Sequence, residues 1–78
     1  MITIKYFGML AEQAKCQQEH LEFKELTLAE LIEDIKTKHQ FNSLSFNVAL
    51  NQKLVQNSKD QKLKYNDEIA LLPPFAGG

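Results

Sequence analysis

Apolar and polar residues alternate in several short stretches of the chain. In the first stretch Ile2, Ile4 and Tyr6 stand at every second position, a period that predicts a β-strand with one buried face. Strands are predicted on this basis over four segments: residues 2–7, 20–24, 46–50 and 68–72. The last of them ends at two prolines, which lack the backbone donors that a longer strand needs.

Turn-forming residues join the later strands. Residues 51–53 are polar and precede the short apolar pair at residues 54–55, so we expect a hairpin there. Residues 57–62 are polar and are expected to form a loop. Asn66 predicts a turn before the last strand, because asparagine tolerates left-handed backbone geometry.

Residues 27–39 show a helical period instead. Thr27 and Glu30 match a capping box, in which the two side chains satisfy free amides at a helix start. The apolar positions that follow have the i, i+3, i+4, i+7 spacing of a helix with one buried stripe: Leu28, Leu31, Ile32 and Ile35. A shorter helix is predicted over residues 9–15, which are rich in helix-forming residues.

One main helix beside a mixed sheet predicts an α+β layer architecture. A single main helix between two pairs of strands favours the ubiquitin-like β-grasp, with the short helix after the first strand. A ferredoxin-like fold would need a second full helix, and nothing between residues 50 and 68 is long or periodic enough. We expect residues 1–72 to form the domain and residues 73–78 to form a flexible tail.

Composition narrows the possible functions. The chain has 78 residues, 44% of them apolar, which suffices for one domain with a thin core and no deep active site of its own. Nine lysines and no arginine stand against ten acids, so a nucleic-acid surface is not expected. No apolar run approaches the ~20 residues of a membrane span, and the first residues lack the pattern of a secretion signal. A single cysteine suits a cytoplasmic protein.

Isolated reactive side chains are expected to be structural. Cys16 lacks the histidine and orienting partner that a nucleophile requires. His20 and His39 belong to no cysteine or histidine cluster, so we expect no metal site. The acid pairs at residues 33–34 and 67–68 are expected to be exposed, on a helix face and in a turn, because adjacent side chains point apart.

The C-terminal segment combines a stiff spacer with an unhindered end. Prolines favour an extended backbone that holds the following residues away from the domain. Two glycines can pass through a narrow channel and bring the terminal carboxylate of Gly78 to a nucleotide phosphate. Adenylation would give that carboxylate a leaving group, which a sulfur nucleophile could displace to form a thiocarboxylate. The residues predicted to thread into a partner are Pro73, Pro74, Phe75, Ala76 and Gly77.

These segments resemble one known family. Residues 67–78, which read Asp-Glu-Ile-Ala-Leu-Leu-Pro-Pro-Phe-Ala-Gly-Gly, are similar to the end of the small subunit of molybdopterin synthase. Residues 48–55 are similar to its central hairpin and residues 2–11 to its beginning, so the resemblance spans essentially the whole chain. One departure is Asn66, where the family commonly has glycine; asparagine preserves the turn.

The resemblance implies a sulfur carrier that is not an enzyme on its own. An adenylating enzyme would activate Gly78 with ATP, and a sulfurtransferase system would convert its carboxylate to a thiocarboxylate. The tail would then enter the large synthase subunit, which would hold the catalytic residues, and donate sulfur to cyclic pyranopterin monophosphate. Two small and two large subunits would assemble, with no resident cofactor or metal and with neither nucleic acid nor membrane as a partner.

Alternation also predicts a docking surface beside the tail. If the alternate apolar residues of the first strand face the helix, Phe7 faces away from it, and the same argument turns Leu72 away in the last strand. Leu54 lies beside the hairpin turn. Exposed apolar residues near a reactive tail indicate a partner surface. Alternatively, Phe7 and Leu72 cover a second small core or are ordinary isolated apolar residues.

Three other functions fit parts of the pattern. A thiamine-pathway sulfur carrier would share the fold and the chemistry, but those proteins usually end in two glycines without the Leu-Pro-Pro element. A ubiquitin-like modifier would be conjugated to lysines. A non-reactive interaction module would use its surface and leave the tail idle.

Overall fold

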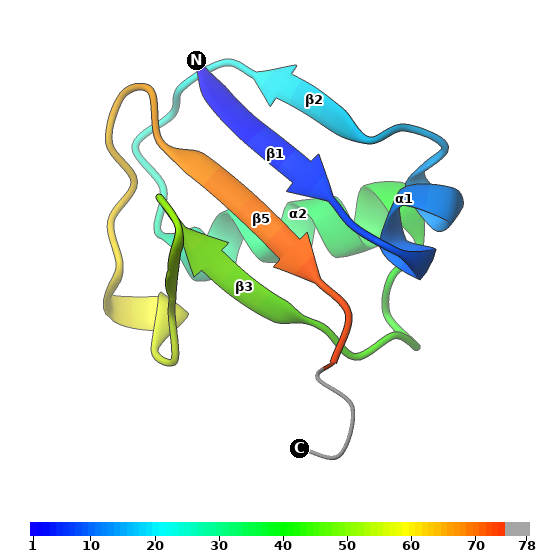
Figure 1. Ribbon diagram of the computed structural model, residues 1–78. Coiled ribbons are helices and arrows are strands. Elements are labelled where there is room, and N and C mark those ends of the chain that lie inside the picture. Colours follow the sequence, from blue (N-terminus) through cyan, green and yellow to red (C-terminus); the bar gives the residue numbers. More distant parts are fainter. Residues whose placement is uncertain (75–78) are drawn as a thin grey trace.

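A computed structural model describes residues 1–74 as a five-stranded sheet with one main helix across one face (Figure 1). The predicted tail residues Phe75, Ala76, Gly77 and Gly78 lie outside the described residues. The strands are β1 (Ile2–Tyr6), β2 (Gln18–Leu21), β3 (Asn47–Leu50), β4 (Lys53–Leu54) and β5 (Glu68–Leu72). The helices are α1 (Met9–Ala14), α2 (Leu28–His39) and the short 3-10 helix η1 (Ser58–Asp60).

The strand order is β2-β1-β5-β3-β4, with β1 and β5 parallel at the centre and the other pairs antiparallel. The first and last strands of the chain are therefore neighbours. Helix α2 follows β2 and precedes β3 in the chain, and it crosses one face of the sheet (Figure 1). This arrangement confirms the predicted β-grasp. It places the end of β5, where the tail begins, in the middle of the sheet.

The main helix forms as its local sequence predicts. The Thr27 hydroxyl accepts a hydrogen bond from the Glu30 amide at 3.2 Å, and the Glu30 carboxylate accepts one from the Thr27 amide at 2.9 Å. The apolar stripe of α2 is buried against the inward-facing residues of the central strands, which are Ile2, Ile4, Tyr6, Ile69 and Leu71. Within residues 1–74, the opposite face of the sheet carries no helix (Figure 1).

The second strand differs from its prediction. It runs from Gln18 to Leu21, whereas alternation predicted residues 20–24. Its antiparallel register pairs Leu21 with Ile2, the first residue of β1, so residues 22–24 have no strand to pair with. Phe23 instead packs edge-to-face against Tyr65, with 5.8 Å between the ring centroids. Within the predicted loop 57–62, three residues form η1.

Asp67 corrects a second prediction. Its side chain is buried, although the acid pair at residues 67–68 was expected to be exposed. One carboxylate oxygen accepts a hydrogen bond from the Lys64 amide at 2.7 Å, and the other accepts one from the Asn51 side-chain amide at 3.0 Å. The Glu68 amide donates to the Asn51 side-chain oxygen at 2.9 Å. These bonds tie the β3–β4 turn to the start of β5.

Replacing Asp67 with alanine is expected to destabilise the fold by about 2 kcal/mol, because it leaves two partly buried donors without acceptors. Urea unfolding followed by circular dichroism measures the loss. Asp60→Ala is the matched control: its carboxylate accepts one exposed hydrogen bond from Asn57, and its loss should stay within about 0.5 kcal/mol. Equal losses in the two variants would contradict the structural role assigned to Asp67.

Candidate functional site

The tail leaves the sheet at the end of β5, between β1 and β3. The Phe7 amide donates a hydrogen bond to the Leu71 carbonyl at 3.2 Å, so β1 is held beside the last residues of β5. Pro73 is half-buried and Pro74 is exposed. The chain therefore emerges from the centre of the sheet at one end of the molecule (Figure 1).

Gly8 forms one side of this exit. Its backbone has φ of 59° and ψ of −134°, a combination that side-chain-bearing residues rarely adopt. A Cβ atom at this position would lie 2.7 Å from the Pro73 Cγ atom. The proline ring thus rests directly on the glycine backbone. Gly8 lies between the predicted first strand and the predicted short helix, and its contact with Pro73 was not predicted.

Strand register determines which residues share the helix-free face of the sheet. Leu72 is paired with Asn47, Ala70 with Ala49, and Ala49 in turn with Leu54. Directly paired residues project to the same side of a sheet, and alternate residues of one strand do so as well. Leu54 and Leu72 therefore lie on one face, opposite to the buried Ile69 and Leu71.

The predicted docking residues gather at this face and at the tail exit. Phe7 is 43% exposed and Leu54 is 57% exposed, while Leu72 is half-buried. The parallel pairing of Tyr6 with Leu71 brings Phe7, the next residue, beside Leu72. We name Phe7, Leu54 and Leu72 the docking surface. Their role in binding stays a prediction.

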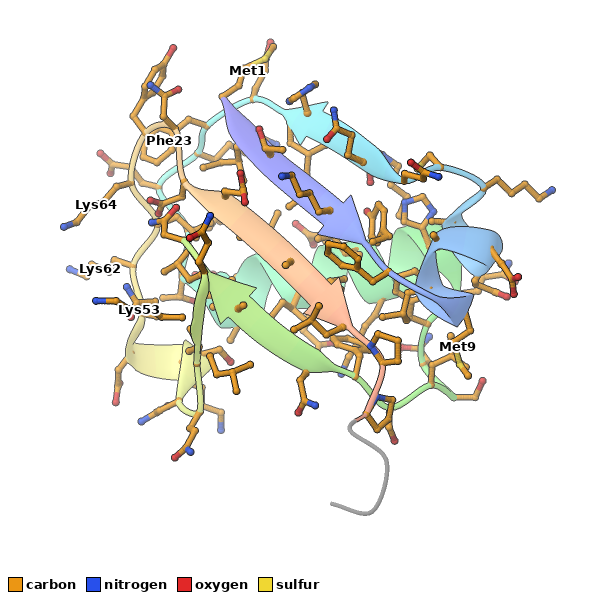
Figure 2. All side chains as sticks on the ribbon, in the orientation of Figure 1. Met1, Met9, Phe23, Lys53, Lys62 and Lys64 are labelled. Carbon is orange, nitrogen blue, oxygen red and sulfur yellow. The ribbon has the colours of Figure 1, made fainter. Side chains whose placement is uncertain are left out.

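Met9 extends the apolar character of the exit and was missed by the sequence analysis. It is 51% exposed at the start of α1, and it lies on the same side of the molecule as the end of β5 (Figure 2). The available signal was a large apolar residue directly after the glycine that interrupts the first strand. It was read only as a helix-forming residue.

A polar network joins the sheet edge to the end of α2. The Glu19 carboxylate accepts a hydrogen bond from the Tyr6 hydroxyl and lies 2.9 Å from both His39 Nε2 and Lys38 Nζ. Burial by itself would raise the pKa of Glu19, but the hydrogen bonds from Tyr6, His39 and Lys38 and the charge of Lys38 lower it to about 2. Burial, and then the hydrogen bond to Glu19 and its charge, raise the pKa of Tyr6. This network fastens β2 to α2, and none of its members was predicted to interact.

The depressed pKa of Glu19 predicts a loss of stability in acid. The unfolded chain binds a proton at Glu19 near pH 4.5, whereas the folded chain does so only near pH 2. The stability that ionised Glu19 contributes to the fold is therefore complete above about pH 5 and declines as the pH falls towards 2. We expect the free energy of unfolding to drop by about 2 kcal/mol between pH 6 and pH 3 from this group. Urea titrations of the wild type and of Glu19→Gln at each pH measure this drop in the free energy of unfolding. An equally steep decline in Glu19→Gln would show that Glu19 is not its cause.

The remaining candidate side chains lie apart from the tail exit. Cys16 is half-buried against the core, and His20 is exposed on β2, where its ring lies 3.1 Å from the Thr3 hydroxyl. Within residues 1–74, no three side chains of the metal-ligating types gather into a cation site. Over the same residues, no helix is long and apolar enough to cross a bilayer.

Comparison with known proteins identifies a family model and a curated relative that match this chain. The model of the ThiS family matches residues 4–78. A molybdopterin synthase sulfur carrier subunit from Dictyostelium discoideum is 38% identical over 48 residues, which cover 55% of this chain and 56% of that protein. The match thus spans about half the length of that curated relative.

Solved structures give similarity over nearly the whole chain. The molybdopterin converting factor subunit 1 of Pyrococcus furiosus is 28% identical, with a TM-score of 0.84 over 95% of this chain and 97% of that one. A complex of subunits 1 and 2 of the molybdopterin-converting factor from Helicobacter pylori contains a chain that is 28% identical, with a TM-score of 0.72 and coverage of 99% and 97%. The small archaeal modifier protein 1 of Haloferax volcanii, 21% identical, shares the fold with a TM-score of 0.79 over 95% and 97%.

Proposed function

This chain belongs to the ThiS family, and we propose that it is the sulfur carrier subunit of a molybdopterin synthase. The observation that carries the proposal is the pairing of an unhindered Gly-Gly end with a proline spacer that emerges beside exposed apolar residues. The Dictyostelium relative and the Pyrococcus structure support the molybdopterin pathway. The complex from Helicobacter pylori supports a second subunit as the partner.

The reacting group in this proposal is the main-chain carboxylate of Gly78. One of its oxygens attacks the α-phosphorus of ATP on an activating enzyme, which forms a glycyl adenylate and releases pyrophosphate. The outer sulfur of a persulfide on a sulfurtransferase then displaces AMP to form an acyl disulfide, and a thiol of the partner enzymes cleaves its sulfur–sulfur bond, which releases the thiocarboxylate and leaves a disulfide on the partner side. An unbranched residue crowds the attacking sulfur least, which accounts for glycine at this position. ATP is consumed by the partner, so this chain needs no resident cofactor.

The second half of the reaction takes place on the large subunit. The thiocarboxylate enters that subunit's active site, and its sulfur bonds to cyclic pyranopterin monophosphate. Water then cleaves the acyl–sulfur bond, so the sulfur stays on the pterin and the carboxylate of Gly78 is restored. Groups that activate the pterin belong to the large subunit in this scheme, because a chain with so thin a core encloses no deep site. A heterotetramer with two copies of each subunit would give every carrier its own active site.

The length of the tail suits this task. Six residues, 73–78, follow β5, and fully extended they would reach at most about 20 Å. Because two of the six are prolines, the chain gives up less conformational freedom on entering a channel than a flexible tail of the same length. The apolar residues around the exit would seat against the partner while the tail is inserted.

Reconstitution tests the proposal. The chain, its activating enzyme, a sulfur source and its large subunit are combined with the pterin precursor, and molybdopterin formation is measured. Intact-mass analysis of the loaded chain should reveal a species heavier by the difference between sulfur and oxygen. Loading without product would contradict the molybdopterin assignment, and absence of loading would contradict the carrier chemistry itself.

The thiamine pathway is the second candidate, because the same loaded chain could serve a thiazole-forming enzyme and the matching family model is named ThiS. The Leu-Pro-Pro element of residues 72–74 favours the molybdopterin pathway. Offering the loaded chain to each acceptor enzyme in turn decides between the two pathways.

A further inference from the structure

The charges of this chain are unevenly distributed. Residues 53–64 contain four lysines and one aspartate, a formal charge of +3 in a chain whose total is −1. Residues 19–34 contain six acids and one lysine. Exposed lysines that gather on one side of a protein give it a local field that can orient it as it approaches a charged partner.

Three of the lysines in the basic segment point outward from one side of the molecule. Leu63 is buried, and its amide donates to the Leu26 carbonyl at 3.0 Å, so its neighbours Lys62 and Lys64 project to solvent. Lys53 is exposed on β4. Figure 2 shows the three side chains directed away from the body on the side of β4 and of the segment that leads to β5. We name Lys53, Lys62 and Lys64 the basic edge.

These lysines are unpaired over the described part of the chain. Salt bridges within residues 1–74 engage Lys5, Lys36 and Lys38, and the basic edge takes part in none of them. Its charge is thus available to an external group. Lysines on an edge strand can also serve to prevent sheet-to-sheet aggregation. That purpose would account for Lys53 but not for Lys62 or Lys64, which lie outside the named strands.

The basic edge adjoins the docking surface. Lys53 directly precedes Leu54 in β4, and Leu54 projects to the helix-free face through its pairing with Ala49. Lys53 itself pairs with Leu50, which pairs with the buried Ile69, so it projects to the other face at the outer edge of the sheet. A partner seated on Leu54 would reach it around the edge of β4. One surface hollow is lined by residues that include Lys53, Leu54 and Gln61, and Gln61 directly precedes Lys62 in the chain.

We propose that the basic edge receives an acidic surface on the protein that accepts the tail, and that it guides this protein into the docked orientation. The inference rests on the proposed function. Exposed charges at an interface rim contribute little to affinity but can raise the association rate by tenfold or more at low salt. A nucleic-acid partner is disfavoured by the overall negative charge and by the absence of arginine.

The test compares two charge-matched double variants of the full chain. Lys53→Glu/Lys62→Glu reverses two of the three charges of the basic edge, and Lys15→Glu/Lys24→Glu makes the same net change at exposed positions that follow α1 and β2. Association and dissociation rates with the purified large subunit are measured by stopped flow at low and high salt. Circular dichroism establishes that both variants fold.

We expect the basic-edge variant to associate about tenfold more slowly than the wild type at low salt, and the control within about twofold. Dissociation rates should change little, and the difference in association should vanish at high salt because of screening. Equal slowing of both variants, or of neither, would overturn the inference while leaving the carrier function intact. A wild-type chain that binds no large subunit would instead contradict the proposed function.

Discussion

Adding one alanine after Gly78 is expected to reduce sulfur transfer at least about 100-fold, since displacement of a reacting group by as little as 1 Å can cost that much. The extension moves the terminal carboxylate one residue further along the chain and places a methyl group beside it. Both changes oppose adenylation and attack by sulfur. The extended chain should still fold, because the addition follows the last residue and touches none of the core. The reconstituted synthase reaction, started with unloaded chain, measures the loss.

The matched control carries the same alanine before Met1, which is 54% exposed. This variant should transfer sulfur at the wild-type rate. Gly78→Ala separates the two effects of the extension, because it adds the methyl group without displacing the carboxylate. Full activity of the chain extended at its C-terminus would show that the terminal carboxylate is not the donor, and the interaction-module alternative would then apply.

Leu54→Glu is expected to weaken binding of the large subunit about 30- to 100-fold, or roughly 2–3 kcal/mol. Leu54 is 57% exposed in the free chain, so a charge there costs little stability. In the docked state the carboxylate would be removed from water with no cation committed to it. Isothermal titration calorimetry with the large subunit measures the change in affinity.

Tyr65→Glu is the control for this variant. Tyr65 is 68% exposed and precedes the N-terminal end of β5, so it lies at the opposite end of that strand from the tail. Like Leu54→Glu, the Tyr65→Glu substitution removes a large, mainly apolar side chain and adds one negative charge. Its affinity for the large subunit should stay within about twofold of the wild type. Equal weakening by both substitutions would mean that overall charge, rather than the docking surface, governs the complex.

Elements encoded by neighbouring residues were predicted well. The main helix depends on a capping box and an apolar stripe that together span residues 27–35, so no distant contact was needed to recognise it. The turns at Asn51 and Asn66 have left-handed backbone angles, with φ of 51° and 68°. Short polar residues tolerate that geometry, and the pattern therefore located both turns.

Elements that depend on a distant partner were predicted less well. The limits of β2 follow from the length of β1, because unpaired strand residues gain no ladder hydrogen bonds. Asp67 was expected to be exposed in a turn because adjacent acidic side chains point apart, but it is buried and hydrogen-bonded to Asn51 and Lys64. The association of Tyr6, Glu19 and His39 likewise joins residues 13 and 20 positions apart.

The sequence by itself therefore determined the two α-helices, the turns, the alternating strands and the chemically distinctive end, since each is specified within a few adjacent residues. Only the tertiary structure decided that Gly8 supports Pro73 and that Leu54 shares a face of the sheet with Leu72. It also decided that lysines from two separate segments form one edge. These spatial neighbourhoods arise from strand order and register, which depend on contacts between residues that are far apart in the sequence.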